Sequence, residues 1–321
     1  MSGWLLKIVG ALLILSALAL ALSRAPDRAV ESLVARWAPP PSDFIDVKGQ
    51  LVHLRDEGPR HTGENSPLPL VLIHGTSASL HTWEGWVKAL KTQQRVITLH
   101  LPAFGLTGPF TGQYDPADYR GDTYARFVLD LLDQLQVRRF VIGGNSLGGE
   151  VAWRTALLAP ARVDRLILVD SAGLPVERAA VPLGWWVARA PALSWFAEEV
   201  LPRALVARGL SSVYGQPERI TGDLVDRYYE LTLREGNRRA LGLRLRQMDL
   251  GDSSEQLKRL NVPTLILWGG RDRLFPPAVG QRFQAGIAGS RLVVFDDLGH
   301  VPHEEDPART VVPVREFLGL R

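Results

Sequence analysis

Short apolar runs recur along the chain from about residue 43 to the C-terminus, and longer stretches with apolar residues every three or four positions separate them. The run "LPLVLIHG", residues 68–75, is continuously apolar, which is typical of a strand buried on both faces. Residues 122–136 place their apolar side chains on one stripe, which predicts a helix. Strands that alternate with helices predict a mostly parallel sheet covered on both faces. The later strand runs are "RVITLHLP", "RRFVIGG", "RLILVD", "VPTLILWG" and "RLVVFDD".

Two regions depart from this rhythm. "DFIDVKGQLVHLRDEG" predicts a β-hairpin with Lys48 and Gly49 at its turn. Residues 171–260 contain no convincing strand, only helix-like segments with several Trp and Tyr residues, including Trp185, Trp186, Trp195, Tyr214, Tyr228 and Tyr229. We therefore expect a core formed by residues 43–170 and 261–321, with residues 171–260 inserted after the sixth strand as a helical cap.

The N-terminal residues have a different pattern. Residues 4–23 are apolar apart from Lys7, close to the roughly 20 residues that a helix needs to cross a bilayer core. This predicts an N-terminal hydrophobic anchor helix, with a linker up to residue 42 and the domain outside the cytoplasm. A cleaved secretory signal with its site at Ala19-Leu20-Ala21 is the alternative, and it would give a secreted protein.

Composition narrows the possible functions. The chain has 321 residues, 46% of them hydrophobic and 22% charged, as in an ordinary globular protein. Its net charge of +3 is spread along the chain without the Lys/Arg block typical of nucleic-acid binding, so no nucleic-acid partner is expected. It has no Cys, which excludes disulfides, a thiolate nucleophile and Cys-based metal sites.

The stretch "VIGGNSLGGE" places Ser146 between glycines immediately after a predicted strand. Gly144 and Gly148 complete the pattern G-x-S-x-G, in which a sharp strand-to-helix turn exposes a serine. A serine hydroxyl becomes a good nucleophile only beside a base that a carboxylate orients. The sequence must therefore supply a histidine and an acid.

Two residues after predicted strands meet this need. Of seven histidines, His300 stands in a Gly-His turn directly after the last strand, in "FDDLGHVPHEEDP", and His303 is the competing candidate. Asp272 follows the preceding strand in the Gly-rich turn of "LILWGGRDRLFPP". Asp170, at the end of "RLILVD", is the alternative acid, although a structural role in its own turn is favoured there.

The developing oxyanion also needs hydrogen-bond donors. "LIHGTSAS" places His74 and Gly75 after an earlier buried strand, where glycine lets backbone N–H groups turn inward. Leu147 offers a second N–H at the start of the helix that follows Ser146. We expect the His74 side chain to support this turn rather than to act as a base.

These segments resemble the α/β-hydrolase superfamily. "LIHGTSASLHTW", "LPAFGLTG", "GGNSLGGEVAWR", "GGRD" and "GHVPHEEDP" occur in the family's order over about residues 44–320. The resemblance implies Ser146 as nucleophile, His300 as general base and Asp272 as its orienting acid, with the amides of Thr76 and Leu147 as the oxyanion hole. It also implies a cap that shapes the substrate pocket, and no metal or organic cofactor.

Some positions depart from the family pattern. His100 stands where many relatives have Asp, and Ala103 where they often have Gly; we interpret both as structural changes. Asn145 resembles the carbon–carbon bond hydrolases, but these usually carry Trp where this chain has Val301.

We therefore expect a serine esterase of the carboxylesterase or lipase type (EC 3.1.1.-) that acts on a hydrophobic, lipid-like ester. A carbon–carbon bond hydrolase of the meta-cleavage-product type is the second hypothesis. A membrane-tethered binding protein without catalytic activity is the third.

Overall fold

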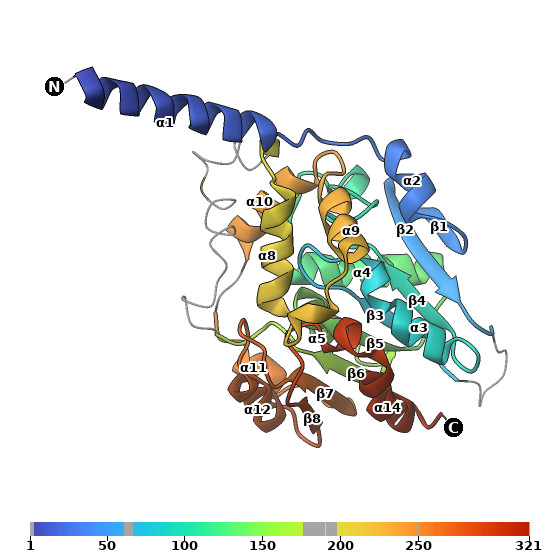
Figure 1. Cartoon of the computed structure of the whole chain (residues 1–321). Coiled ribbons are helices and arrows are strands. Elements are labelled where there is room, and N and C mark those ends of the chain that lie inside the picture. The colour runs from blue at the N-terminus through green and yellow to red at the C-terminus, as the bar shows by residue number, and fades with distance from the viewer. Residues whose placement is uncertain (1–2, 61–66, 176–189, 191–197, 249–250, 321) are drawn as a thin grey trace.

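An eight-stranded sheet forms the centre of the molecule (Figure 1). The computed structural model describes residues 3–60, 67–175, 190, 198–248 and 251–320. The strands lie side by side in the order β1-β2-β4-β3-β5-β6-β7-β8. Their bounds are Ser42–Val47 for β1, Gln50–Glu57 for β2, Leu70–Ile73 for β3, Val96–Leu99 for β4, Phe140–Asn145 for β5, Val163–Val169 for β6, Thr264–Gly269 for β7 and Arg291–Phe295 for β8.

The sheet is mostly parallel, as the sequence predicts. β1, β2 and β4 pair antiparallel, and every pair from β4 through β3, β5, β6 and β7 to β8 is parallel. Lys48 and Gly49 form the turn between β1 and β2, both with positive φ, so the predicted hairpin is confirmed. Because the parallel strands all point the same way, their carboxyl ends meet at one edge.

Helices cover both faces of the sheet, because side chains alternate between the faces along each buried strand. On one face, the core joins strand residues such as Ile73 and Ile142 to α4 (Gly121–Gln134), α5 (Leu147–Leu158) and α12 (Pro277–Gly286). On the other, Leu72 and Val141 pack with α3 (Glu84–Leu90) and α14 (Pro307–Leu318). Short helices complete this core at η1 (Leu80–Trp83), η2 (Gly112–Tyr114) and α13 (Pro302–Glu305).

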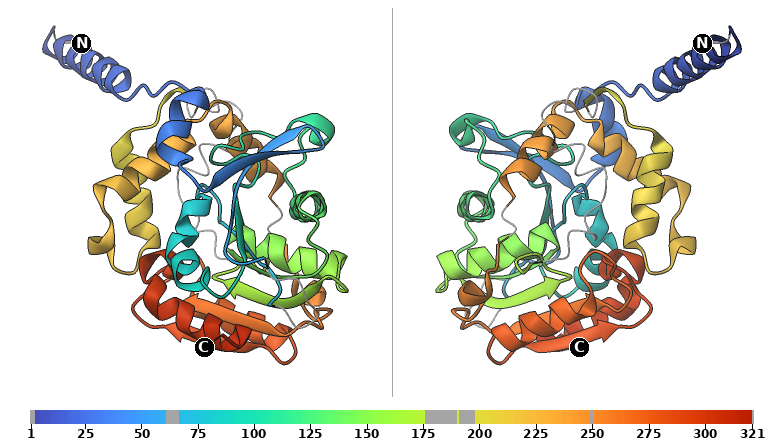
Figure 2. Two further views of the ribbon diagram at one scale, coloured as in Figure 1. Left: turned by 90° about the vertical axis from the view of Figure 1, so that its right-hand side faces the viewer. Right: turned by 90° about the vertical axis from the view of Figure 1, so that its left-hand side faces the viewer.

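The insertion between β6 and β7 is helical over its described part and contains no strand there. Its helices are α8 (Arg203–Val213), η5 (Pro217–Arg219), α9 (Gly222–Thr232), α10 (Asn237–Gln247) and α11 (Ser254–Leu257). α8, α9 and α10 gather on one side of the molecule (Figures 1 and 2). Of the aromatic residues expected in the cap, Trp185, Trp186 and Trp195 lie outside the described residues.

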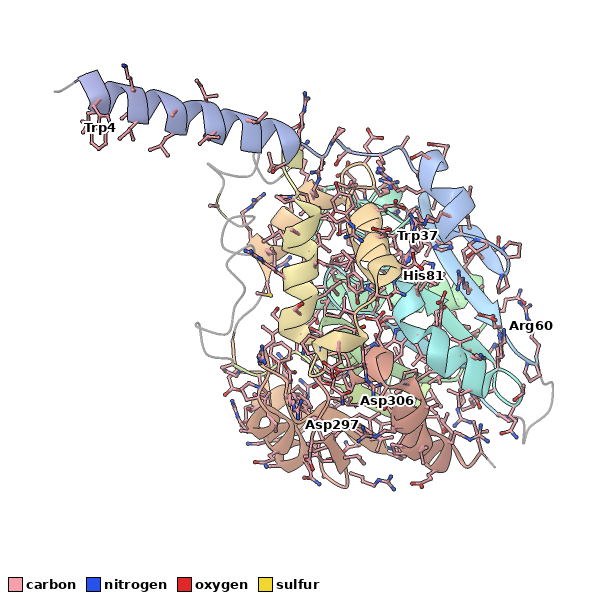
Figure 3. The ribbon with its side chains drawn as sticks, in the orientation of Figure 1. Trp4, Trp37, Arg60, His81, Asp297 and Asp306 are labelled. Atoms are coloured by element: carbon pink, nitrogen blue, oxygen red, sulfur yellow. The ribbon has the colours of Figure 1, made fainter. Side chains whose placement is uncertain are left out.

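The N-terminal helix α1 (Gly3–Leu22) projects away from the body of the molecule, with Trp4 near its outer end (Figures 2 and 3). Its described large apolar side chains, among them Trp4, Leu12 and Ile14, are exposed. Within the part of the chain that the structure describes, no helix has the length and apolar character that crossing a membrane requires. This finding does not support the membrane anchor expected over residues 4–23. The expected placement outside the cytoplasm stays a prediction.

The chain after α1 packs against the cap, where the sequence suggested a linker. α2 (Glu31–Trp37) buries Leu33 against Leu106 and the α9 residue Leu231. Glu230 of α9 accepts hydrogen bonds from Arg36 at 2.9 Å and from the Trp37 indole at 2.7 Å. Only one side chain of α2 is fully buried, which gives too weak an apolar stripe to be noticed in the sequence.

Replacing Leu33 by Ala should therefore weaken the contact between α2 and the cap. We expect a loss of about 2–5 kcal/mol in the free energy of unfolding, the usual range for truncating a buried leucine. Leu51→Ala removes an exposed side chain and should change stability by less than about 0.5 kcal/mol. Chemical denaturation of both variants measures the difference; equal losses would contradict the packing described for α2.

Candidate active site

Ser146 stands at the turn between β5 and α5, in a conformation that side chains rarely adopt. Its φ is 55° and its ψ is −118°. A side chain at Gly148 would meet the Ile73 carbonyl at 2.1 Å, and one at Gly144 would meet the Gly148 carbonyl at the same distance. Both glycines are therefore needed for α5 to approach the sheet this closely, and the sharp turn at Ser146 depends on them.

His300 and Asp272 are hydrogen-bonded to each other beside this turn. The Nδ1 atom of His300 lies 2.7 Å from Oδ2 of Asp272, and both side chains are buried. Oδ1 of Asp272 accepts the backbone N–H groups of Leu274 and Phe275 at 2.8 and 2.9 Å. These three donors hold the carboxylate in one orientation and leave Nε2 of the imidazole available for another partner.

Asn145 joins the serine turn to the histidine loop. Its side-chain amide donates to the carbonyl of His300 at 2.9 Å and to that of Val169 at 3.1 Å. The backbone N–H of His300 in turn donates to the carbonyl of Val213, at the end of cap helix α8, at 2.7 Å. The sequence showed Asn145 only as part of a family variant; the structure gives it a positioning role.

The two amides expected to bind an oxyanion are free within the described part of the chain: the N–H groups of Thr76 and Leu147 donate to no acceptor there. A side chain at Gly75 would lie 2.9 Å from Oδ1 of Asn145, so only glycine fits this turn. His74 supports it, because its Nδ1 bonds to the Gly75 carbonyl at 2.7 Å and its Nε2 accepts the Leu101 amide at 3.1 Å.

A scan against protein-family models decides the family. The model for the alpha/beta hydrolase fold matches residues 69–307, about three quarters of the chain. The chain belongs to the α/β-hydrolase family.

Members with known names have different activities. 2-Hydroxymuconate semialdehyde hydrolase from Pseudomonas sp. strain CF600 is 27% identical over 286 residues, which cover 85% of this chain and 92% of that protein. A meta-cleavage product hydrolase from Pseudomonas fluorescens IP01 has a TM-score of 0.71 at 26% identity and covers 86% of this chain and 97% of its own. A membrane phospholipase A has a TM-score of 0.70 at 25% identity and covers 99% of this chain and 98% of its own.

His303, the competing base, has a different environment in this α/β-hydrolase. It is fully buried, its Nε2 lies 3.0 Å from the Thr82 hydroxyl, and its ring packs on Trp83 with centroids 4.0 Å apart. Burial holds its pKa well below the ordinary value for histidine. No carboxylate orients it among the described residues, so the geometry favours His300 as the base.

The residues that differ from the family pattern are structural. His100 is fully buried, and its Nδ1 lies 2.9 Å from both Nδ1 of His53 and the Leu106 amide. Ala103 has a φ of 80° in the same turn, where its amide bonds to the Gly108 carbonyl at 2.7 Å. Val301 packs with Leu210, Tyr214 and Val225 of the cap.

Two cavities lie near the cap. One of about 10 Å³ is lined by Ser77 and Ala78, which follow Thr76 in the chain, by Phe104, and by Leu231 and Leu241 of the cap. Another of about 620 Å³ lies between α2, α9 and α13, with Trp37 and His81 among its lining residues (Figure 3). Neither Ser146 nor His300 lines either of these two cavities, so the reaction is assigned to neither.

Asp170, Asp272 and His300 place their polar atoms within 4.8 Å of one another, a spacing that a metal ion could also use. The three N–H donors directed at Asp272 indicate a different role for this carboxylate. It accepts three hydrogen bonds, which suits a charged carboxylate that orients a histidine.

Buried histidines should make this fold sensitive to acid. Burial lowers the pKa of His53 to about 3 and that of His74 to about 4, and it lowers the pKa values of His81, His100 and His303 in the same direction. Unfolded histidines protonate near pH 6.5, so the stabilisation present above that pH is lost as the pH falls towards the folded values. We expect the free energy of unfolding to decrease by roughly 1.4 kcal/mol per pH unit for each such histidine.

Denaturation curves between pH 7 and 5 measure this slope. His303→Gln keeps a side-chain amide for the Thr82 hydroxyl and removes one titrating group, so its slope should be smaller by one proton. An unchanged slope in this variant, or stability independent of pH in the wild type, would contradict the prediction.

Proposed function

We propose that this α/β-hydrolase cleaves carboxylic esters, with Ser146 as nucleophile, His300 as general base and Asp272 as the acid that orients His300. The observation that carries the proposal is the buried 2.7 Å contact between His300 and Asp272 beside the strained turn of Ser146. This arrangement suits acyl transfer through a covalent intermediate.

In the proposed reaction, the hydroxyl oxygen of Ser146 attacks the ester carbonyl and Nε2 of His300 takes its proton. The N–H groups of Thr76 and Leu147 stabilise the oxyanion of the tetrahedral intermediate. His300 then returns the proton to the leaving alcohol, and an acyl-enzyme remains on Ser146. Water, deprotonated by the same histidine, releases the acid and restores the serine.

A hydrophobic, lipid-like acyl group is the proposed substrate class. Apolar side chains from the core and the cap, Phe104, Leu231 and Leu241, line the small cavity beside the Thr76 turn. The similarity to a membrane phospholipase A extends over 99% of this chain, including its N-terminal segment. The similarity to a phospholipase supports an ester with an apolar acyl chain. Such a chain would have to displace cap side chains to enter here, because a cavity of about 10 Å³ holds no more than one water molecule.

A carbon–carbon bond hydrolase is the second candidate, favoured by the names of two relatives. Such a reaction would use a cation in the cap to bind the substrate carboxylate. Three buried or mostly buried cap arginines instead pair with carboxylates of the chain: Arg227 with Glu304, Arg238 with Asp27 and Arg244 with Glu150. These three guanidinium groups are neutralised within the chain, which makes them poor partners for a substrate carboxylate.

A binding protein without catalytic activity is the third candidate. It would not need a carboxylate with three donors, a histidine held by that carboxylate and two unengaged amides around one serine. We therefore rank it below both hydrolases.

A fluorophosphonate probe tests the nucleophile. We expect covalent labelling of the full-length wild type at Ser146 and loss of labelling in Ser146→Ala and His300→Ala. Ser212→Ala, which removes an exposed serine of α8, is the matched control and should be labelled like the wild type. If the folded wild type takes no label, an acyl-enzyme is excluded and the binding protein becomes the favoured candidate.

Turnover distinguishes the two hydrolases. We expect kcat/KM for p-nitrophenyl esters to rise from acetate to medium-length acyl chains, and Asp272→Asn to lower kcat by about 10⁴-fold because it disturbs the histidine tautomer. Faster cleavage of a 2-hydroxy-6-oxodienoate than of any ester in the series would select the carbon–carbon bond hydrolase instead.

A further inference from the structure

A second carboxyl group lies against the proposed catalytic acid. Asp170 follows β6 and Asp272 follows β7, and these strands pair in parallel with Val169 opposite Leu267. Polar atoms of the two carboxyl groups and of His300 lie within 4.8 Å of one another. Asp170 is fully buried, and its φ of 43° lies outside the range of a strand, so β6 ends before it.

The two carboxyl groups have different hydrogen-bond partners. Asp272 accepts three N–H donors, from Leu274, Phe275 and His300. Asp170 accepts one, from the amide of Gly269 to its Oδ1 at 2.9 Å. Its Oδ2 is buried and receives no donor within the described part of the chain.

Two buried carboxylates within 4.8 Å of each other repel, which favours the state in which one of them keeps a proton. The donors around Asp272 stabilise its negative charge, and Asp170 has much less of this stabilisation. Burial, followed by the charge of Asp272, raises the pKa of Asp170 well above its ordinary value, and the charge of Glu305 acts in the same direction. Of these two carboxyl groups, Asp170 is therefore the one that keeps the proton.

We propose that Asp170 is a positioning residue of the active site, a neutral carboxylic acid whose Oδ2–H donates a hydrogen bond to the carboxylate of Asp272. This gives Asp272 a fourth donor, disperses its charge and moderates how strongly it holds the imidazolium of His300. The kinetic consequence rests on the proposed esterase function, whereas the location of the proton does not.

Asparagine at position 170 is the variant that matches this state. Its amide can accept from Gly269 with Oδ1 and donate to Asp272 with Nδ2, and Asn tolerates a positive φ as well as Asp does. Glycine at position 170 also tolerates the backbone conformation, but it removes the donor. Comparing Asp170→Asn with Asp170→Gly separates the loss of the hydrogen bond from the loss of the carboxyl group.

The pH dependence of stability locates the proton without any substrate. Asp170 binds a proton in the folded protein but not in the unfolded chain above about pH 4, so folding of the wild type is opposed increasingly as the pH rises. Asp170→Asn lacks this effect. We expect its unfolding equilibrium constant, relative to that of the wild type, to fall about tenfold for each pH unit between pH 5 and 8.

Asp164→Asn is the control, because Asp164 lies in β6 and pairs with Arg139 at 2.6 Å. Its difference from the wild type should not change over this pH range. A pH-independent difference for Asp170→Asn would overturn the inference. Infrared spectra offer a second readout: the C=O band of a protonated carboxylic acid at pH 7 should be present in the wild type and absent in Asp170→Asn.

Kinetics test the effect on His300. Asp170→Asn keeps a hydrogen-bond donor to Asp272 and should leave the pH profile of kcat/KM unchanged. In Asp170→Gly, Asp272 lacks this donor and holds the imidazolium of His300 more strongly. The acid limb of the kcat/KM profile of Asp170→Gly should therefore move up by about one pH unit. Equal profiles for the two variants would overturn the positioning role. If the wild type hydrolyses no ester, the proposed function fails, and the stability and infrared measurements still decide where the proton is.

Discussion

The parallel register of β5, β6 and β7 is the constraint on which the site depends. It ends three strands at one edge, so Ser146, Asp170 and Asp272 come together although they are far apart in the chain. The glycines at positions 144 and 148 let α5 approach that edge closely enough to form the sharp turn at Ser146. A shift of one residue in either strand pair would turn these side chains towards the opposite face of the sheet.

Exclusion of water gives this edge its chemistry. Burial keeps the surrounding histidines neutral, and His74 uses both of its ring nitrogens to brace the turn of Gly75. The same burial forces Asp170 and Asp272 into different protonation states, because only Asp272 has enough donors to carry a charge. Each polar group thus has a role set by its hydrogen bonds.

Short contacts join the cap to the site, whereas the side chains proposed to react, Ser146, Asp272 and His300, all come from the core. The carbonyl of Val213 receives the His300 amide, and Val301 packs beneath cap residues Leu210 and Val225. Relatives with the same fold include carbon–carbon bond hydrolases and a phospholipase. The fold is therefore compatible with several substrates and does not by itself identify the one that this chain cleaves.

The sequence by itself determined the parts of this protein that depend on local pattern. Continuous apolar runs identified the buried strands, the Lys48-Gly49 pair identified the hairpin, and glycines around Ser146 identified the serine turn. Tertiary structure alone decided the rest. Asn145 meets a carbonyl 155 residues away at His300, Asp170 meets Asp272 only because β6 and β7 are neighbours, and α2 packs on α9 through one buried leucine. Local pattern carries no information on which strand ends become neighbours. Because neighbouring groups set the ionisation of a buried carboxyl, the protonation of Asp170 could not be predicted from the sequence.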